Sequence, residues 1–113
     1  MFAVKSGGHS FISGSSNSIG GVTIDLGQLS VVELLEDGTK AKIGTGATWG
    51  NVFAGLEYSG LAVTGGRLSD IGVGGFTLGG GISYLSLKYG LACDNVIEYE
   101  VSKLSPFHAV ICL

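Results

Sequence analysis

Glycine is the feature that most limits what this chain can fold into, since it supplies 21 of the 113 residues. The uncharged stretch 71–87 combines strongly apolar residues with six glycines. Each glycine inside a helix costs about 1 kcal/mol relative to alanine, and the stretch is slightly short for a bilayer span. We therefore exclude a membrane-spanning helix here, expect no membrane partner, and predict tight turns joined by short elements.

Charge and cysteine content argue against two further classes of protein. Only 13% of the residues are charged, the net charge is −3, and the six Lys and Arg residues are scattered. Nucleic-acid-binding surfaces need clustered cations, so we expect no nucleic-acid partner. Cys93 and Cys112 do not form a CxxC pair, so we expect neither a metal site nor a disulfide framework. The mean hydropathy of +0.48 predicts apolar surface that another segment or chain covers.

Local patterns predict short strands in the first half of the chain. Residues 1–5 form one strand-like run, and the β-branched alternation of residues 22–26 predicts another. Residues 13–21 are polar and rich in turn-forming types, which indicates a loop. Two apolar runs then flank Asp37 and Gly38, and an Asp-Gly pair between such runs favours a β-hairpin.

An apolar stripe predicts one amphipathic helix after the hairpin. Its members recur at the i, i+3, i+4, i+7 spacing of a helix face: Trp49, Val52, Phe53 and Leu56. Thr48 stands where it can cap the start of this helix, and Gly60 stands where the helix can stop. We expect the two aromatic side chains of the stripe to pack in the core.

The second half predicts a shorter helix and one more strand. Apolar residues at 82, 85 and 89 suggest a helix that ends at Gly90, and the alternation within residues 96–101 predicts a strand. Strands followed by a helix in each half predict an α+β fold made of two small layers. We place the boundary between them near residues 60–65.

Two glycine-rich segments lie next to small hydroxyl residues: SGGHS at residues 6–10 and GVGGFTLGGG at residues 72–81. Successive N–H groups without neighbouring Cβ atoms can converge on an anion, and a diphosphate has a suitable size. The alternative is that both segments are turns of a β-rich protein with no ligand. Neither standard nucleotide fingerprint is present, because Thr77 replaces the last glycine of GxGxxG and no GxxxxGK[ST] occurs.

Four segments, in this order and spacing, resemble one known family. They are VKSGGHS (4–10), GVTIDLGQL (21–29), GATWGNVFAGLEYSGLAVTGG (46–66) and DIGVGGFTLGGGISYLSLKYGLACDNVIEYEV (70–101). Residues 3–101 resemble the FAD-binding PCMH-type domain of the vanillyl-alcohol-oxidase and p-cresol-methylhydroxylase family, and most of all its berberine-bridge-enzyme-like oxidases. The resemblance implies an α+β fold in which FAD lies between two small subdomains.

The resemblance also implies which residues contact the cofactor. In this family the loop that matches SGGHS wraps the FAD diphosphate with backbone amides, and a histidine in the place of His9 is commonly joined to the 8α carbon of the flavin. Leu68 stands where some relatives carry a second tethering cysteine, so we expect His9 to be the one covalent link. Residues 79–81 are expected to open a helix. The implied cofactor-binding residues are Ser6, Gly7, Gly8, His9, Ser10, Ser69, Asp70, Gly72, Gly74, Gly75, Gly79, Ile97 and Val101.

The resemblance implies an FAD-linked oxidoreductase, in which the flavin accepts a hydride from a small organic substrate and oxygen is the acceptor. Relatives carry an FAD-contacting segment before the SGGHS loop and a substrate domain that supplies the catalytic base. We therefore expect a partial domain over residues 3–101 and a divergent tail over residues 102–113, in which His108 has no role. We also expect no catalytic residue and no activity in these 113 residues alone. The alternative is a non-catalytic fragment that binds FAD weakly or not at all.

Overall fold

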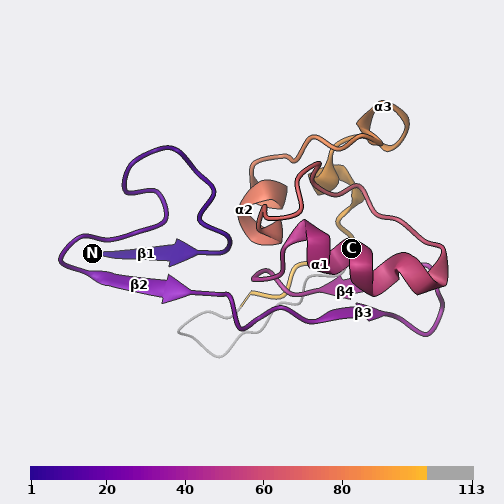
Figure 1. The fold of residues 1–113 in the computed structure, drawn as a ribbon, viewed down its shortest axis with the longest axis horizontal. Helices are drawn as coiled ribbons and strands as arrows, with labels where there is room; N and C mark the ends of the chain where they lie inside the picture. The colour runs from indigo at the N-terminus through magenta and orange to yellow at the C-terminus, as the bar shows by residue number, and fades with distance from the viewer. Residues whose placement is uncertain (102–113) are drawn as a thin grey trace.

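The computed structural model describes residues 1–101 and shows a two-stranded sheet beside a larger body of a hairpin and short helices (Figure 1). In chain order the elements are β1 (Phe2–Lys5), β2 (Val22–Asp25), β3 (Val32–Leu34), β4 (Ala41–Ile43), α1 (Trp49–Leu56), the 3₁₀ helix η1 (Glu57–Ser59), α2 (Val73–Leu78), α3 (Ser86–Tyr89) and the 3₁₀ helix η2 (Ala92–Asn95). This mixture of strands and helices confirms the α+β prediction. Among residues 1–101, no helix combines the length and the apolar composition that crossing a membrane requires.

Strands β1 and β2 form where the sequence predicts and pair in parallel, with Phe2 opposite Val22 and Lys5 opposite Asp25. An ion pair closes the end of this sheet, with 2.7 Å between Lys5 Nζ and Asp25 Oδ2. The large apolar side chains of both strands stay exposed, Ile24 the least at 46%. Parallel strands usually bury both faces. The exposed apolar side chains of this sheet are therefore part of the apolar surface that the high mean hydropathy predicts.

The β3–β4 hairpin forms around the Asp-Gly pair, as predicted. The two strands are antiparallel, with Val32 opposite Ile43. Gly38 adopts a left-handed φ of +65°, and the Asp37 carboxylate accepts a hydrogen bond from the Thr39 N–H at 2.9 Å. The turn residues therefore set a register in which Ile43 points into the core, where it is 3% exposed.

Helix α1 begins and stops as the sequence predicts. The Thr48 hydroxyl accepts a hydrogen bond from the Asn51 N–H at 3.4 Å, which caps the first turn. The α-helical part ends at Leu56, and η1 continues the helical course to Gly60. Gly60 has a φ of +68°, a left-handed conformation that favours glycine at a helix end.

Trp49 lies at the centre of the core. Its side chain and those of Val52 and Leu56 are at most 2% exposed. Phe53 is 39% exposed, so the prediction that it packs in the core is wrong. Its ring lies at the edge instead, with its centroid 6.1 Å from that of Trp49. The buried stripe is narrower than the sequence pattern, because this short helix turns only one face to the interior.

The second half of the chain closes the core over Trp49. Val73 is 4% exposed, and the ring of Phe76 meets the indole edge-on with centroids 5.2 Å apart. Gly65 passes so close to the indole that a Cβ there would lie 2.7 Å from Trp49 Cζ3. One hydrophobic core therefore includes residues on both sides of residues 60–65. The subdomain boundary that we placed there remains a prediction.

Helix α2 differs from the expectation that residues 79–81 open a helix. The helix precedes these residues, and Gly79 is its C-cap. Gly80 and Gly81 follow in left-handed conformations, with φ of +95° and +78°. A right-handed helix cannot continue through such residues, so the glycine triplet ends a helix and the expectation is wrong.

The predicted strand over residues 96–101 is also absent. Only Glu98 takes part in a single bridge, because the described part of the chain offers this stretch no continuous neighbouring strand with which to pair. The short helix predicted before Gly90 does form, as α3, although it covers only four residues. His108 and the expected tail lie outside the described residues.

Replacing Val52 by alanine should lower the free energy of unfolding by about 2 kcal/mol, because two buried carbons are lost and a cavity remains. Val31→Ala is the matched control: Val31 is 57% exposed, and its truncation should change stability by no more than about 0.5 kcal/mol. Urea unfolding followed by the fluorescence of Trp49 measures both. Equal losses in the two variants would contradict this description of the core.

Candidate functional site

The two glycine-rich segments meet backbone to backbone. Figure 1 shows the loop after β1 facing α2. A Cβ on Gly7 would lie 2.6 Å from the backbone nitrogen of Gly72 and 2.8 Å from its Cα. A Cβ on Gly72 would likewise collide with the backbone nitrogen of Gly7. Side chains at these two positions would push the segments apart, so glycine is required here by close approach.

The core positions one side of this contact. The Trp49 N–H donates to the Ile71 carbonyl at 3.0 Å, and the Val73 N–H donates to the Ala47 carbonyl at 2.9 Å. Gly72 lies between these two hydrogen bonds, as one half of an isolated bridge. The buried start of α1 therefore fixes the segment that the SGGHS loop touches.

A serine hydroxyl positions the other side. Ser6 donates its hydroxyl proton to the Thr45 carbonyl at 2.6 Å. The same oxygen accepts a hydrogen bond from the Gly74 N–H at 3.3 Å. Three segments that are far apart in the sequence are thereby joined at one half-buried side chain.

The loop held in this way presents a row of free donors. Within the described residues, five successive backbone N–H groups donate no hydrogen bond: Gly7, Gly8, His9, Ser10 and Phe11. Gly8 has a φ of +69°, so the chain bends within the row. Successive N–H groups around such a bend form a nest that binds anions.

The row borders a cavity of about 510 Å³. Its lining combines the SGGHS loop, the start of α2 and apolar side chains that include Val4, Phe11 and Leu26. His9 is the one titratable side chain among the described lining residues, and it is exposed. A ligand here would meet backbone donors at one end and apolar surface beside them.

Lys5, the residue before the SGGHS loop, pairs with Asp25 and does not line the cavity. Lys5 bonds to Asp25, and the Lys5 ammonium lowers the pKa of that carboxyl by its hydrogen bond, aided by the Gly27 N–H. The described lining of the cavity contains no lysine or arginine. An anion in this cavity would therefore be held by backbone dipoles.

The structure brings together most of the predicted cofactor residues. Those that line the 510 Å³ cavity are Ser6, Gly7, Gly8, His9, Ser10, Gly72, Gly74 and Gly75. Ser69 and Asp70 lie shortly before Gly72 in the chain but do not line the cavity, and Gly79 lies at the far end of α2. Ile97 lines a different cavity, and Val101 is the last described residue.

The cavity is also lined by residues that sequence reasoning did not assign to the site, among them Phe11, Ser16, Thr45 and Phe76. Thr45 bonds through its carbonyl oxygen, and a backbone contact leaves no mark on residue type. Phe76 could have been suggested by its apolar character within a glycine-rich run, although such a residue is usually part of a core.

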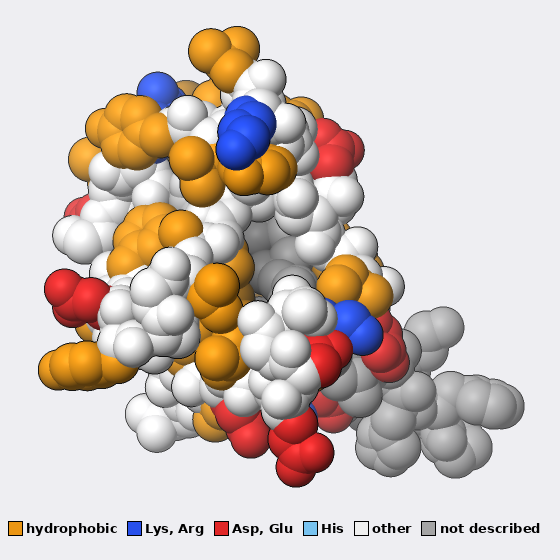
Figure 2. Space-filling view, turned by 90° about the vertical axis from the view of Figure 1, so that its right-hand side faces the viewer, with side chains coloured by type: hydrophobic (Ala, Val, Ile, Leu, Met, Phe, Trp, Pro, Cys, Tyr) orange, Lys and Arg blue, Asp and Glu red, His pale blue; other side chains and the backbone are white. Residues whose placement is uncertain are grey.

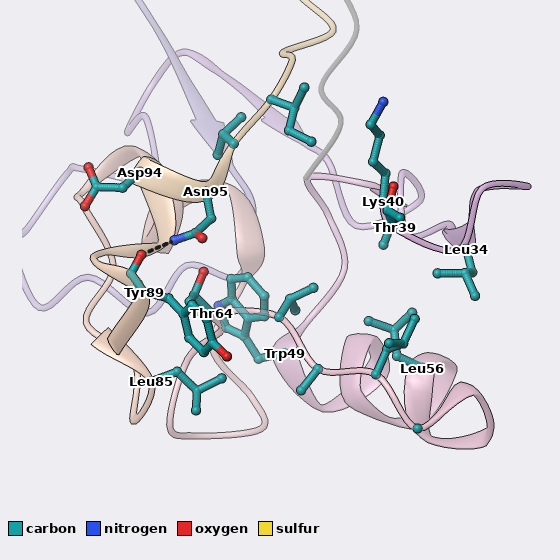
Figure 3. Close-up of a pocket in the computed structure, with 18 residues that line it drawn as sticks. Leu34, Thr39, Lys40, Trp49, Leu56, Thr64, Leu85, Tyr89, Asp94 and Asn95 are labelled. Atoms are coloured by element: carbon teal, nitrogen blue, oxygen red, sulfur yellow. Dashed lines mark hydrogen bonds between the residues drawn. The ribbon is translucent and has the colours of Figure 1, made fainter. Parts of the chain in front are cut away.

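A second cavity, of about 920 Å³, lies between the hairpin, α1 and residues 85–97 (Figure 3). Figure 2 shows hydrophobic side chains beside a hollow on one face of the molecule. The buried Trp49 Nε1 has no hydrogen-bond partner within the described residues. Asn95 is already engaged, since its side-chain amide donates to the carbonyls of Tyr89 and Leu91 at 2.9 and 2.8 Å.

This second cavity lacks the features of a reaction centre. Asp94, the one carboxylate in its described lining, accepts a hydrogen bond from the Leu91 N–H at 2.7 Å. In residues 1–101, no group of three or more His, Cys, Asp or Glu side chains is arranged to hold a metal ion. The 510 Å³ cavity is therefore the better candidate for a ligand site.

Comparison with known proteins identifies relatives of this arrangement. A family model described as FAD binding domain matches residues 1–103. The FAD-dependent monooxygenase tpcD of Cochliobolus heterostrophus is 54% identical over 100 residues, which are 88% of this chain and 19% of that protein. The VAO-type flavoprotein MtVAO615 of Myceliophthora thermophila superimposes with a TM-score of 0.86 at 30% identity, over 97% of this chain and 21% of that one. A variant of berberine bridge enzyme gives a TM-score of 0.78 at 35% identity, over 86% and 20%.

These matches confirm both the resemblance and the fold class. The chain spans about a fifth of the length of the curated relatives it matches, and the solved flavoproteins share its arrangement of strands and helices. Since the family model covers nearly the whole chain, this protein belongs to the FAD-binding domain family of vanillyl-alcohol-oxidase and berberine-bridge-type oxidoreductases.

Proposed function

We propose that this chain forms the diphosphate-binding part of the FAD site of an FAD-linked oxidoreductase. The observation that carries the proposal is the row of five unpaired N–H groups from Gly7 to Phe11 beside the 510 Å³ cavity. Bound FAD would supply a ring that accepts a hydride from a carbon of a small organic substrate. Oxygen as the final acceptor is part of the proposal and rests on the family alone.

The residues present fit a diphosphate in three respects. Its oxygens need several donors, and the row supplies them without a side-chain cation. The backbone at Gly7 and Gly72 carries no Cβ that would separate the two segments. Gly75, also in the lining, faces open space, since a Cβ there would meet no atom within 4 Å.

Gly75→Leu tests this site without disturbing the fold. A Cβ at this position would meet no atom within 4 Å, and leucine favours a helix more than glycine does, so we expect stability not to fall. FAD affinity, measured by isothermal titration calorimetry, should fall at least about tenfold, which corresponds to 1.4 kcal/mol. Ala54→Leu, at an exposed position of α1, is the control and should leave affinity unchanged. Equal FAD affinity in the two variants would refute the assignment of this cavity.

His9 is proposed as the single covalent tether of the flavin. It stands in the row of N–H groups, its side chain is exposed, and within the described residues it makes no side-chain hydrogen bond. A neutral imidazole nitrogen is a competent nucleophile. The new C–N bond replaces a methyl C–H and the imidazole N–H, and dioxygen can take up the two electrons and two protons released. Leu68 has no group that could form a second link.

Acid precipitation tests the tether. Protein supplied with FAD and oxygen should remain yellow in the pellet, whereas His9→Ala should release its flavin into the supernatant. Peptide mapping of the wild-type pellet should locate the flavin on the peptide that contains His9. A flavin-bearing peptide that contains Cys93 would overturn the assignment.

We further propose that residues 1–113 bind flavin without turning over substrate. His9 is the one titratable group in the described cavity lining, so no separate base is positioned there, and a positioned base typically contributes about 10²–10⁴-fold. The chain with FAD should form no substrate-dependent hydrogen peroxide over a panel of alcohols, sugars and amines. Peroxide formation would contradict this. Failure to bind FAD at all would favour the alternative of a non-binding fragment.

A further inference from the structure

We propose that Ser6 is a positioning residue that holds the N–H row in its binding geometry, and that it does not itself donate to the cofactor. This inference rests on the proposed function, because the row matters only if an anion binds there. The resemblance placed Ser6 among the cofactor contacts without distinguishing these two roles.

The hydrogen-bonding capacity of the hydroxyl separates the two roles. A serine hydroxyl has one proton to donate and two lone pairs that can accept. The Ser6 hydroxyl donates its proton to the Thr45 carbonyl at 2.6 Å and accepts a hydrogen bond from the Gly74 N–H at 3.3 Å. A diphosphate oxygen is an acceptor, so Ser6 could donate to it only by giving up the bond to Thr45.

The same hydroxyl is the hydrogen-bonded link between the two glycine-rich segments. Within residues 1–101, no other hydrogen bond joins residues 6–11 to residues 70–75. The contact between Gly7 and Gly72 has no side chain to hold it. Glycine loses more conformational freedom on ordering than other residues, so an unbraced loop would have to be ordered by the ligand at a cost in affinity.

Ser6→Ala should therefore weaken FAD binding about tenfold, the effect of one net hydrogen bond. Ser30→Ala is the matched control, since Ser30 is exposed, lies outside the lining of both cavities and makes no side-chain hydrogen bond within the described residues. Its FAD affinity should match that of the wild type. Circular dichroism and Trp49 fluorescence confirm that both variants are folded before they are titrated.

The decisive measurement is made without FAD. Backbone ¹⁵N relaxation should show lower order parameters at residues 7–11 in Ser6→Ala than in the wild type and in Ser30→Ala. A residue that only contacted the ligand would leave the free loop unchanged, so unchanged order parameters would overturn the inference even if affinity fell. Absence of FAD binding by the wild type would instead refute the proposed function, while the relaxation comparison would still decide whether Ser6 orders the loop.

Discussion

The close approach of Gly7 to Gly72 is the contact on which the candidate site depends. Each glycine lies where the other's backbone would collide with a Cβ. The contact brings the loop after β1 beside the start of α2, and within the described residues the N–H groups of this cavity-lining loop have no hydrogen-bond acceptor. A chain with side chains at these two positions would separate the segments and lose the cavity's shape.

Backbone hydrogen bonds at the start of α1 connect the hydrophobic core to the candidate site. Trp49 is completely buried, and its backbone N–H donates a hydrogen bond to the carbonyl of Ile71, one residue before Gly72. The hydrophobic free energy that buries the indole therefore also fixes the segment against which the SGGHS loop rests. Because Gly7 and Gly72 touch without a hydrogen bond in between, the Ser6 hydroxyl supplies the specific bonds that the hydrophobic core cannot supply.

Much of this arrangement could be predicted from local sequence, and the exceptions have a common cause. The hairpin at Asp37-Gly38 and the cap at Thr48 follow from turn and capping chemistry, which acts between near neighbours. Helix α2 was not predicted, because six of the ten residues from 72 to 81 are glycine, and glycine disfavours helix. Tertiary hydrogen bonds from Val73 and Gly74 hold its first turn instead. Within residues 1–101 the expected strand over residues 96–101 has no continuous neighbouring strand, and a strand partner that is distant in the sequence leaves no local signal. Likewise, the family resemblance identified Ser6 as a site residue, but its proposed positioning role rests on the hydrogen bond to the Thr45 carbonyl, which only the structure shows.

Amide chemical shifts during a titration with ADP test most directly whether the N–H row binds a diphosphate. ADP carries the diphosphate without the flavin ring, so the result does not depend on the covalent link. The account predicts that the largest downfield shifts of amide protons occur between Gly7 and Phe11, because these groups exchange water for phosphate oxygens as acceptors. Shifts concentrated around Thr64 and Asn95 in the second cavity, or no shifts at millimolar ADP, would contradict it.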